Sequence, residues 1–162
     1  DEALAMYPAT KDTEVYMALS RFATDRGVAR HAREQARWMD GTSSTTYVYH
    51  FSRDSPHHQW TGLGATHTAE LPYLFGNLQF AARNGDLSTL ELVDRRLSQA
   101  MMRYWTHFAA TGDPNTDGLP VWPAFTDDTE DLLDLGAEIA AGHWPRPDGL
   151  DLLDRLFDDN QP

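Results

Sequence analysis

The chain contains no cysteine among its 162 residues. Disulfide bonds, zinc–thiolate sites and a cysteine nucleophile are therefore excluded together for these residues. Basic residues are scarce as well, because 13 Lys and Arg stand against 25 Asp and Glu, for a formal net charge of −12. A surface of that sign repels phosphate backbones and anionic lipid headgroups, so we expect neither nucleic acid nor a membrane as a partner.

Long apolar runs are also missing. No stretch approaches the roughly 20 residues that a membrane-spanning helix needs. The opening "DEALAMYPATKD" has no initiator methionine, and it has neither the basic nor the apolar region of a signal peptide. Hydrophobic residues nevertheless make up 41% of the chain, which is enough material for the core of one domain.

Apolar residues at helical spacing predict four helices. The first covers residues 10–25, with a cap formed by Asp12 or Thr13. The second covers residues 28–39, and its arginines lie largely opposite its apolar face. "STLE", residues 88–91, has the pattern of a capping box and opens the longest helix, which ends at "TGDP". A short amphipathic helix, "GLDLLDRLF", follows near the C-terminal end.

"TTYVYHF", residues 45–51, predicts a strand because it is rich in β-branched and aromatic residues and contains no breaker. Its nearly continuous apolar character is typical of a strand covered on both faces. We expect a second, short strand at about residues 131–135 and no other β structure. A buried strand must pair its backbone with neighbours, so this α/β outline is short of strands and predicts that part of the sheet comes from elsewhere.

One histidine stands where α/β proteins place their chemistry. His67 lies in "GATHTAELPYLFG", residues 64–76, after the strand and just before a short helical stretch. The strand roots such a loop, while its side chains reach a crevice. An imidazole in that position can act as a general base if a nucleophile and an orienting carboxylate are nearby. Spacing alone leaves open the alternative of a surface or packed histidine.

"GLGATHTAELPYLFGNL", residues 62–78, closely resembles the catalytic-histidine segment of the type-B carboxylesterases, the cholinesterase-like and para-nitrobenzyl-esterase-like α/β-hydrolases. "TYVYHF" resembles the strand before that histidine, and residues 97–126, with "YWTHFAATGDPN" and "WPAF", resemble the family's C-terminal helix. "YPATKDTEVYMALSRFATDRG" resembles the helical stretch upstream. The resemblance implies that residues 1–162 are the C-terminal part of a single α/β-hydrolase domain, with no complete second domain.

The same resemblance implies a carboxylic-ester hydrolase in which His67 is the catalytic histidine. The family's Gly-x-Ser-x-Gly elbow is absent from these residues, so we expect the serine nucleophile and the triad acid upstream of this chain. The chain alone would then be inactive, with the N-terminal portion of the enzyme as its partner and a small-molecule ester as substrate. Neither cofactor nor metal is implied. The alternatives are a catalytically silent cholinesterase-like adhesion module and an independently folding helical domain.

Residues around His67 take supporting roles under this resemblance. Glu70 matches the glutamate of the family's His-Gly-x-Glu pattern and would hold the histidine loop, although a carboxylate near a helix N-terminus has a structural explanation too. Thr68 departs from the glycine that usually follows the histidine. Ala69 is small where animal cholinesterases carry an aromatic residue, which implies a roomier pocket. The candidates for lining that pocket, with loop packing as the alternative role, are Trp60, Leu63, Thr66 and Ala69.

The other histidines do not suggest a metal site. His57 and His58 are adjacent, so their side chains diverge, and no His-x-x-x-His spacing occurs. We expect His57 and His58 in an exposed loop, His50 in the strand, and His107 on the surface of the long helix.

Overall fold

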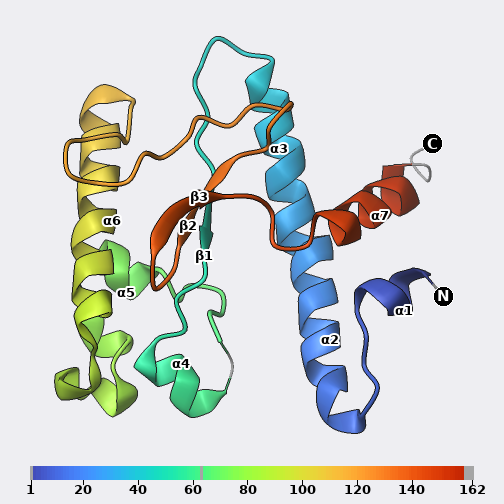
Figure 1. Ribbon diagram of the computed structural model, residues 1–162, viewed down its shortest axis with the longest axis horizontal. Helices are drawn as coiled ribbons and strands as arrows, with labels where there is room; N and C mark the ends of the chain where they lie inside the picture. Colours follow the sequence, from blue (N-terminus) through green and yellow to red (C-terminus); the bar gives the residue numbers. More distant parts are fainter. Residues whose placement is uncertain (1, 63, 159–162) are drawn as a thin grey trace. The chain divides into compact units, whose positions relative to one another are not determined.

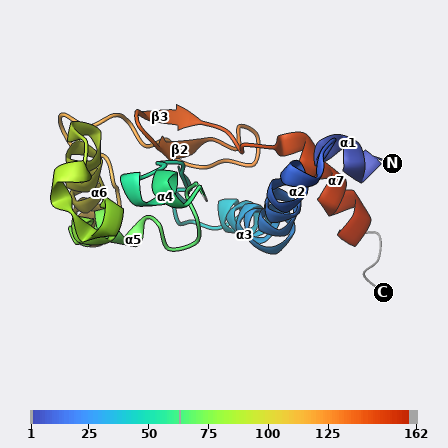
Figure 2. The same ribbon diagram turned by 90° about the horizontal axis from the view of Figure 1, so that it is seen from below.

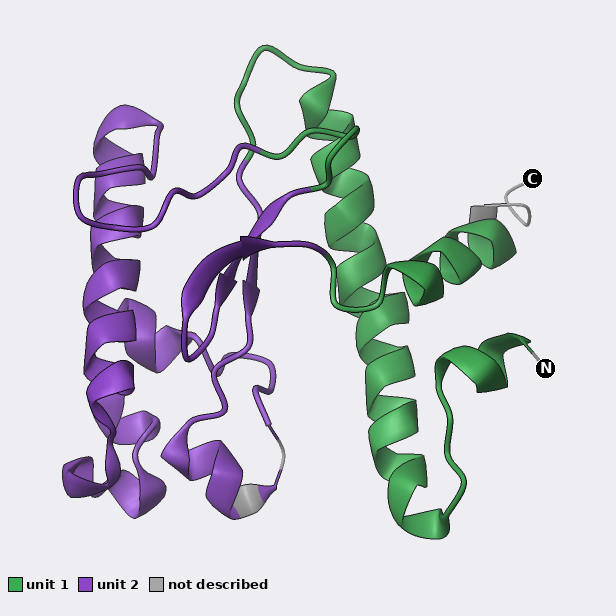
Figure 3. Ribbon diagram, in the orientation of Figure 1, with its two compact units in different colours: residues 1–46, 125–130, 144–162 green, residues 47–124, 131–143 purple. Residues whose placement is uncertain are grey.

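The computed structural model describes residues 2–62 and 64–158, and the chain separates into two compact units (Figure 3). Unit 1 consists of residues 1–46, 125–130 and 144–162, whereas unit 2 consists of residues 47–124 and 131–143.

Unit 1 is built on one continuous helical run, where the sequence predicts two separate helices (Figure 1). α2 (Asp12–Thr24) passes through a π-helical turn, η1 (Asp25–Ala29), into α3 (Arg30–Asp40). The expected cap at Asp12 or Thr13 is wrong, because Lys11 occupies the N-cap position and makes no side-chain cap bond. Two further helices complete the unit, the unexpected α1 (Glu2–Met6) and the expected α7 (Pro147–Asp158).

Contacts between residues that are distant in sequence keep the helical run from α2 to α3 continuous at the π turn. Asp25 is buried there, and Arg146 donates two hydrogen bonds of 2.6 Å to its two carboxylate oxygens. The Tyr7 hydroxyl donates a third, at 3.1 Å. Burial and the neighbouring carboxylate raise the pKa of Tyr7 to about 12. The paired Asp25 carboxylate therefore holds the helix backbone at a position where Gly27 would permit the helix to end.

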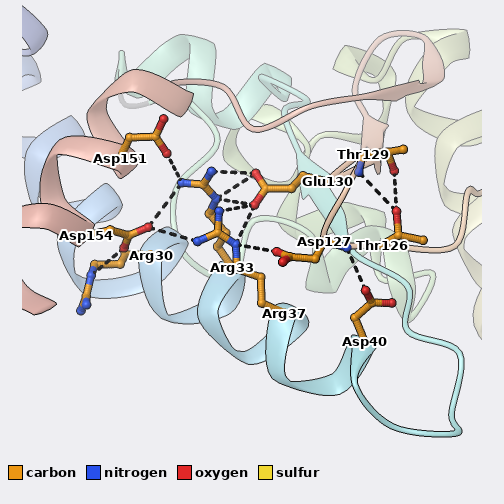
Figure 4. A network of polar contacts seen from close by, with 10 residues as sticks. All are labelled: Arg30, Arg33, Arg37, Asp40, Thr126, Asp127, Thr129, Glu130, Asp151 and Asp154. Carbon is orange, nitrogen blue, oxygen red and sulfur yellow. Dashed lines mark hydrogen bonds and ion pairs between the residues drawn. The ribbon is translucent and has the colours of Figure 1, made fainter.

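The arginines of α3 form much of its buried face (Figure 4). Arg33 is only 5% exposed and donates from Nε to both Glu130 oxygens, at 2.8 and 2.9 Å, and from a terminal nitrogen to Asp151 at 2.6 Å. Val28, the apolar residue that begins the second predicted helix, is 62% exposed. Because a buried guanidinium is tolerated only when it is paired, the acidic partners decide which face is buried. The neighbouring ion pairs join Arg30 to Asp154 and Arg37 to Asp127 and Glu130.

Unit 2 contains a three-stranded sheet in the order β1-β2-β3. β1 (Tyr49–Phe51) runs parallel to β2 (Leu132–Leu135), and β2 runs antiparallel to β3 (Ile139–Gly142). Both expected strands are confirmed, although β1 is shorter than residues 45–51. The prediction that nothing else is β was wrong, because β3 is present. The expected coverage of β1 on both faces is not seen either, since Tyr49 is 38% exposed.

The long helix is α6 (Leu92–Thr111), and Gly112 ends it in the left-handed conformation, as "TGDP" predicts. The capping box, however, is formed by Glu91 and Asp94 and not by the predicted "STLE". Two short helices, α4 (Pro56–Thr61) and α5 (Leu71–Leu74), lie between β1 and α6 along the chain. Three 3-10 turns connect α5 to α6: Leu78–Phe80, Arg83–Gly85 and Leu87–Thr89.

The core of unit 2 lies between α6 and the sheet. Leu97, Met101 and Tyr104 of α6 are buried together with Leu133 and Leu135 of β2, as the apolar stripe of the long helix predicts. Figures 1 and 2 show α5 packed beside α6. Among the helices of the described residues, none is long and apolar enough to cross a bilayer.

Candidate functional site

His67 lies in unit 2, on the segment between α4 and α5. Its side chain is exposed and makes no hydrogen bond or ion pair with residues 2–62 or 64–158. The segment passes through Gly62 and Gly64, with φ of 69° and 68°, in the left-handed region that suits glycine. The Thr66 carbonyl accepts a hydrogen bond from the Ala69 amide at 3.0 Å, so His67 lies inside a tight turn that leads into α5.

The residue after the histidine has an unusual backbone conformation. Thr68 has a φ of 72°, which places a β-branched residue in the left-handed region. Its carbonyl accepts a hydrogen bond from the Leu71 amide at 3.2 Å, so the turn runs directly into the first residue of α5. The turn therefore keeps the conformation that a glycine would adopt freely, although this conformation is sterically unfavourable for threonine.

A buried charged cluster joins three elements of unit 2. Asp94, at the start of α6, has no exposed surface, and Arg53, just after β1, is 7% exposed. The Arg53 Nε donates to Asp94 at 2.8 Å, and the hydroxyl of Tyr73 in α5 donates to the same carboxylate oxygen at 2.7 Å. The second oxygen accepts from the Glu91 amide at 2.8 Å and from a terminal nitrogen of Arg53 at 3.2 Å. The strand end, α5 and α6 are thus tied to one carboxylate.

The electrostatics of this cluster favour the ionised carboxylate. Burial opposes the charge on Asp94, but hydrogen bonds from Arg53 and Tyr73 outweigh burial and hold the pKa of the carboxyl below its usual value. Burial and the Asp94 carboxylate raise the pKa of the Tyr73 hydroxyl well above its usual value. Tyr73 therefore remains a hydrogen-bond donor at all ordinary pH values.

A second contact reaches the His67 segment from α4. Ser55 is buried and caps α4, and its hydroxyl lies 2.8 Å from Nδ1 of His58. Nε2 of His58 lies 3.2 Å from the hydroxyl of Thr66. The expectation that His57 and His58 lie in an exposed loop is wrong, because both belong to α4 and are half-buried. Burial, followed by the nearby His57, lowers the pKa of His58.

Comparison with known proteins identifies the chain. The model of the Carboxylesterase family matches residues 2–147, which is most of its length. The chain belongs to the carboxylesterase family. Members of this family are α/β-hydrolases, and a small mixed sheet with flanking helices is consistent with part of that fold.

Three curated relatives illustrate the similarity. Carboxylesterase 5A of Felis catus is 41% identical over 81 residues, which cover 48% of this chain and 14% of the relative. Bile salt-activated lipase of Rattus norvegicus is 36% identical over 124 residues, 73% of this chain and 18% of the relative. Cocaine esterase of Homo sapiens is 42% identical over 78 residues, 48% of this chain and 13% of the relative. The matched part of this carboxylesterase-family chain thus spans less than a fifth of each relative's length.

The residues that the carboxylesterase resemblance assigns to a pocket lie in different environments. Trp60 is 52% exposed, and the guanidinium of Arg83 lies 5.7 Å from the centre of its ring. Ala69 is buried, Thr66 is exposed and contacts His58, and Leu63 lies outside the described residues.

Glu70, His50 and His107 lie on three different elements of unit 2. Glu70 is half-buried at the N-cap position of α5, where its side chain makes no cap bond. His50 is a residue of β1, as expected, and its Nδ1 lies 2.8 Å from the Asp134 carboxylate. His107 is on α6, also as expected, and its Nδ1 lies 2.7 Å from the Asp113 carbonyl. Within the described part of the chain, no group of three or more acidic and histidine side chains could hold a metal ion.

Sequence reasoning missed the Arg53–Tyr73–Asp94 cluster. The available signal was an aspartate three residues after Glu91, in the first turn of the longest helix, where a carboxylate can accept backbone amides. The arginine partner comes from 41 positions earlier in the chain, a separation that no local pattern reveals.

Proposed function

We propose that this chain is the C-terminal part of a single α/β-hydrolase domain of a serine-dependent carboxylic-ester hydrolase, and that His67 is its catalytic histidine. The observation that carries the proposal is the family match over residues 2–147, which includes the histidine segment. The exposure of His67 on a segment that follows β1 supports it, because a proton-transfer group must reach the substrate.

His67 would act as a general base and then as a general acid. The imidazole takes the proton of the serine hydroxyl while the serine oxygen attacks the ester carbonyl carbon. The imidazolium then gives that proton to the departing alcohol oxygen, and an acyl-enzyme remains. In the second half, the imidazole takes a proton from water as the water oxygen attacks the acyl carbon, and returns it to the serine oxygen when the acid leaves.

The buried cluster of Arg53, Tyr73 and Asp94 supports this role. Proton transfer requires that the imidazole be held to within a fraction of an ångström, and rigid supporting contacts achieve this. Arg53 and Asp94 fix the chain just after β1, and Tyr73 fixes α5, the element that directly follows the His67 segment. Glu70 would assist from the same segment without serving as the triad acid, and the proposed pocket would be lined by Trp60, Leu63, Thr66 and Ala69.

The partner of this chain would be the N-terminal portion of the same enzyme, which supplies the serine and the triad acid. β1 is at the end of the strand order, and its first residue, Tyr49, is 38% exposed. An edge strand with a partly exposed aromatic side chain suits further strand pairing. The substrate would be a small-molecule ester. The reaction would need neither metal nor cofactor, and the enzyme would have neither nucleic acid nor a membrane as a partner.

Steady-state hydrolysis of para-nitrophenyl esters by the full-length enzyme tests this function. His67→Ala should lower kcat/KM by about 10⁴-fold or more, because a triad works as a unit. His143→Ala is the matched control, since that side chain is 71% exposed, and it should retain wild-type kinetics. Wild-type kinetics in His67→Ala would overturn the assignment. An inactive wild-type enzyme would favour the silent adhesion module.

A further inference from the structure

The imidazole of His58 bridges two hydroxyl groups, one from a buried residue and one from the His67 segment. On one side, Nδ1 lies 2.8 Å from the hydroxyl of Ser55, which is buried at the start of α4. On the other side, Nε2 lies 3.2 Å from the hydroxyl of Thr66. The Ser55 hydroxyl also accepts the His58 amide at 3.3 Å, so the inner end of the bridge is fixed to the helix.

The outer end of the bridge is one residue from His67. The Thr66 side chain contacts His58, while the Thr66 carbonyl accepts the Ala69 amide at 3.0 Å. Thr66 is therefore fixed through both its side chain and its main chain. The neighbouring Gly64 has a φ of 68°, and a glycine restrains the backbone little by itself. A side-chain contact at Thr66 thus supplies restraint that the local sequence lacks.

We propose that His58 is a positioning residue, which holds the His67 segment in place through Thr66. The proposal rests on the proposed function, because the positioning matters for catalysis only if His67 is the catalytic histidine. His58 itself does not touch the reacting atoms. Its role is to restrict the movement of the residue that precedes His67.

The state of the imidazole suits this bridge. Burial and the adjacent His57 lower the pKa of His58, so the ring is neutral at neutral pH. A neutral imidazole donates from one nitrogen and accepts at the other, and each hydroxyl can fill the complementary role. Either tautomer therefore joins Ser55 to Thr66.

Two conservative variants separate the two halves of the bridge. In His58→Gln the side-chain amide reaches about as far as Nε2 and can keep the contact with Thr66. In His58→Asn the amide is close to the position of Nδ1 and can keep only the contact with Ser55. His58→Ala removes both contacts, and Thr66→Val removes the hydroxyl of Thr66 while preserving its shape.

Hydrogen exchange of the Ala69 amide in the full-length enzyme reports on the segment without requiring activity. We expect exchange about five- to tenfold faster in His58→Ala, His58→Asn and Thr66→Val, which is the effect of losing one hydrogen bond, and near wild type in His58→Gln. Unchanged exchange in His58→Ala would overturn the inference. So would restoration by asparagine and not by glutamine, because the bridge would then act only within α4.

Ester hydrolysis by the same variants tests the catalytic consequence. His58→Ala should lower kcat by about ten- to a hundredfold with little change in KM, because small misplacements of a catalytic group slow the chemical step, and His58→Gln should recover most of the loss. A rise in KM with kcat unchanged would contradict positioning, because only substrate binding would then be weakened. An inactive wild-type enzyme would overturn the proposed function, and the exchange measurement would still decide whether His58 holds the segment.

Discussion

Replacing Asp94 by asparagine should strongly destabilise the protein. The Asp94 carboxylate is fully buried and accepts hydrogen bonds from Tyr73, from Arg53 and from the Glu91 amide. An asparagine has one carbonyl oxygen in place of two carboxylate oxygens, and its amino group would face a donor. Arg53 would keep an ion pair only with Glu91, whose side chain is 60% exposed. Breaking a buried pair in this way costs about 3–5 kcal/mol.

Urea unfolding followed by circular dichroism measures this cost as the difference in the free energy of unfolding. Asp128→Asn is the control, because it makes the same chemical change at an exposed position and should alter that free energy by less than about 0.5 kcal/mol. Tyr73→Phe should fall between the two at about 2 kcal/mol, since it removes one hydrogen bond to a charged group. A cost below about 1 kcal/mol for Asp94→Asn would refute the view that this cluster anchors α5.

Three further predictions concern stability. Thr68→Gly should stabilise the protein by about 0.5–1 kcal/mol, because glycine adopts a φ of 72° without the penalty of a β-carbon, and a lower melting temperature would contradict this. Arg33→Ala should cost about 3 kcal/mol or more, whereas Arg37→Ala, whose side chain is 35% exposed, should cost about 1 kcal/mol, and equal costs in urea unfolding would contradict the burial argument. The stabilising effect of the Asp94 cluster should be lost at both pH extremes. The lowered pKa of Asp94 gives stability that is present above about pH 4 and lost as pH falls through the folded-state value. The raised pKa of Tyr73 gives stability that is present below about pH 10 and lost as pH rises through its folded-state value. Tyr73→Phe should therefore abolish this alkaline loss and reduce, without abolishing, the acid loss.

Local patterns predicted the elements whose residues carry strong periodic signals. The apolar stripe of α6 and the Gly112 terminus are local features, and both are found as expected. β3 escaped prediction because "IAAG" has a single β-branched residue and pairs only through its neighbour β2. The π turn at Asp25 could not be foreseen, since Arg146, which pairs with that aspartate, lies 121 positions away.

The candidate site shows the same division. The segment around His67 is recognisable from its own residues, and Thr68, which departs from the family's usual glycine, is the residue with the φ of 72°. The bridge through His58 and the Asp94 cluster were not found, because each joins residues from different elements. Buried polar clusters of this kind depend on tertiary packing and leave little trace in hydrophobic patterning.

Labelling of the full-length enzyme with a fluorophosphonate probe tests the central claim most directly, because the probe reacts only with an activated serine. The account predicts that the wild-type enzyme and His143→Ala are labelled at the same rate, and that His67→Ala is not labelled on that timescale. Labelling of His67→Ala at the wild-type rate would contradict the assignment of His67 as the catalytic base.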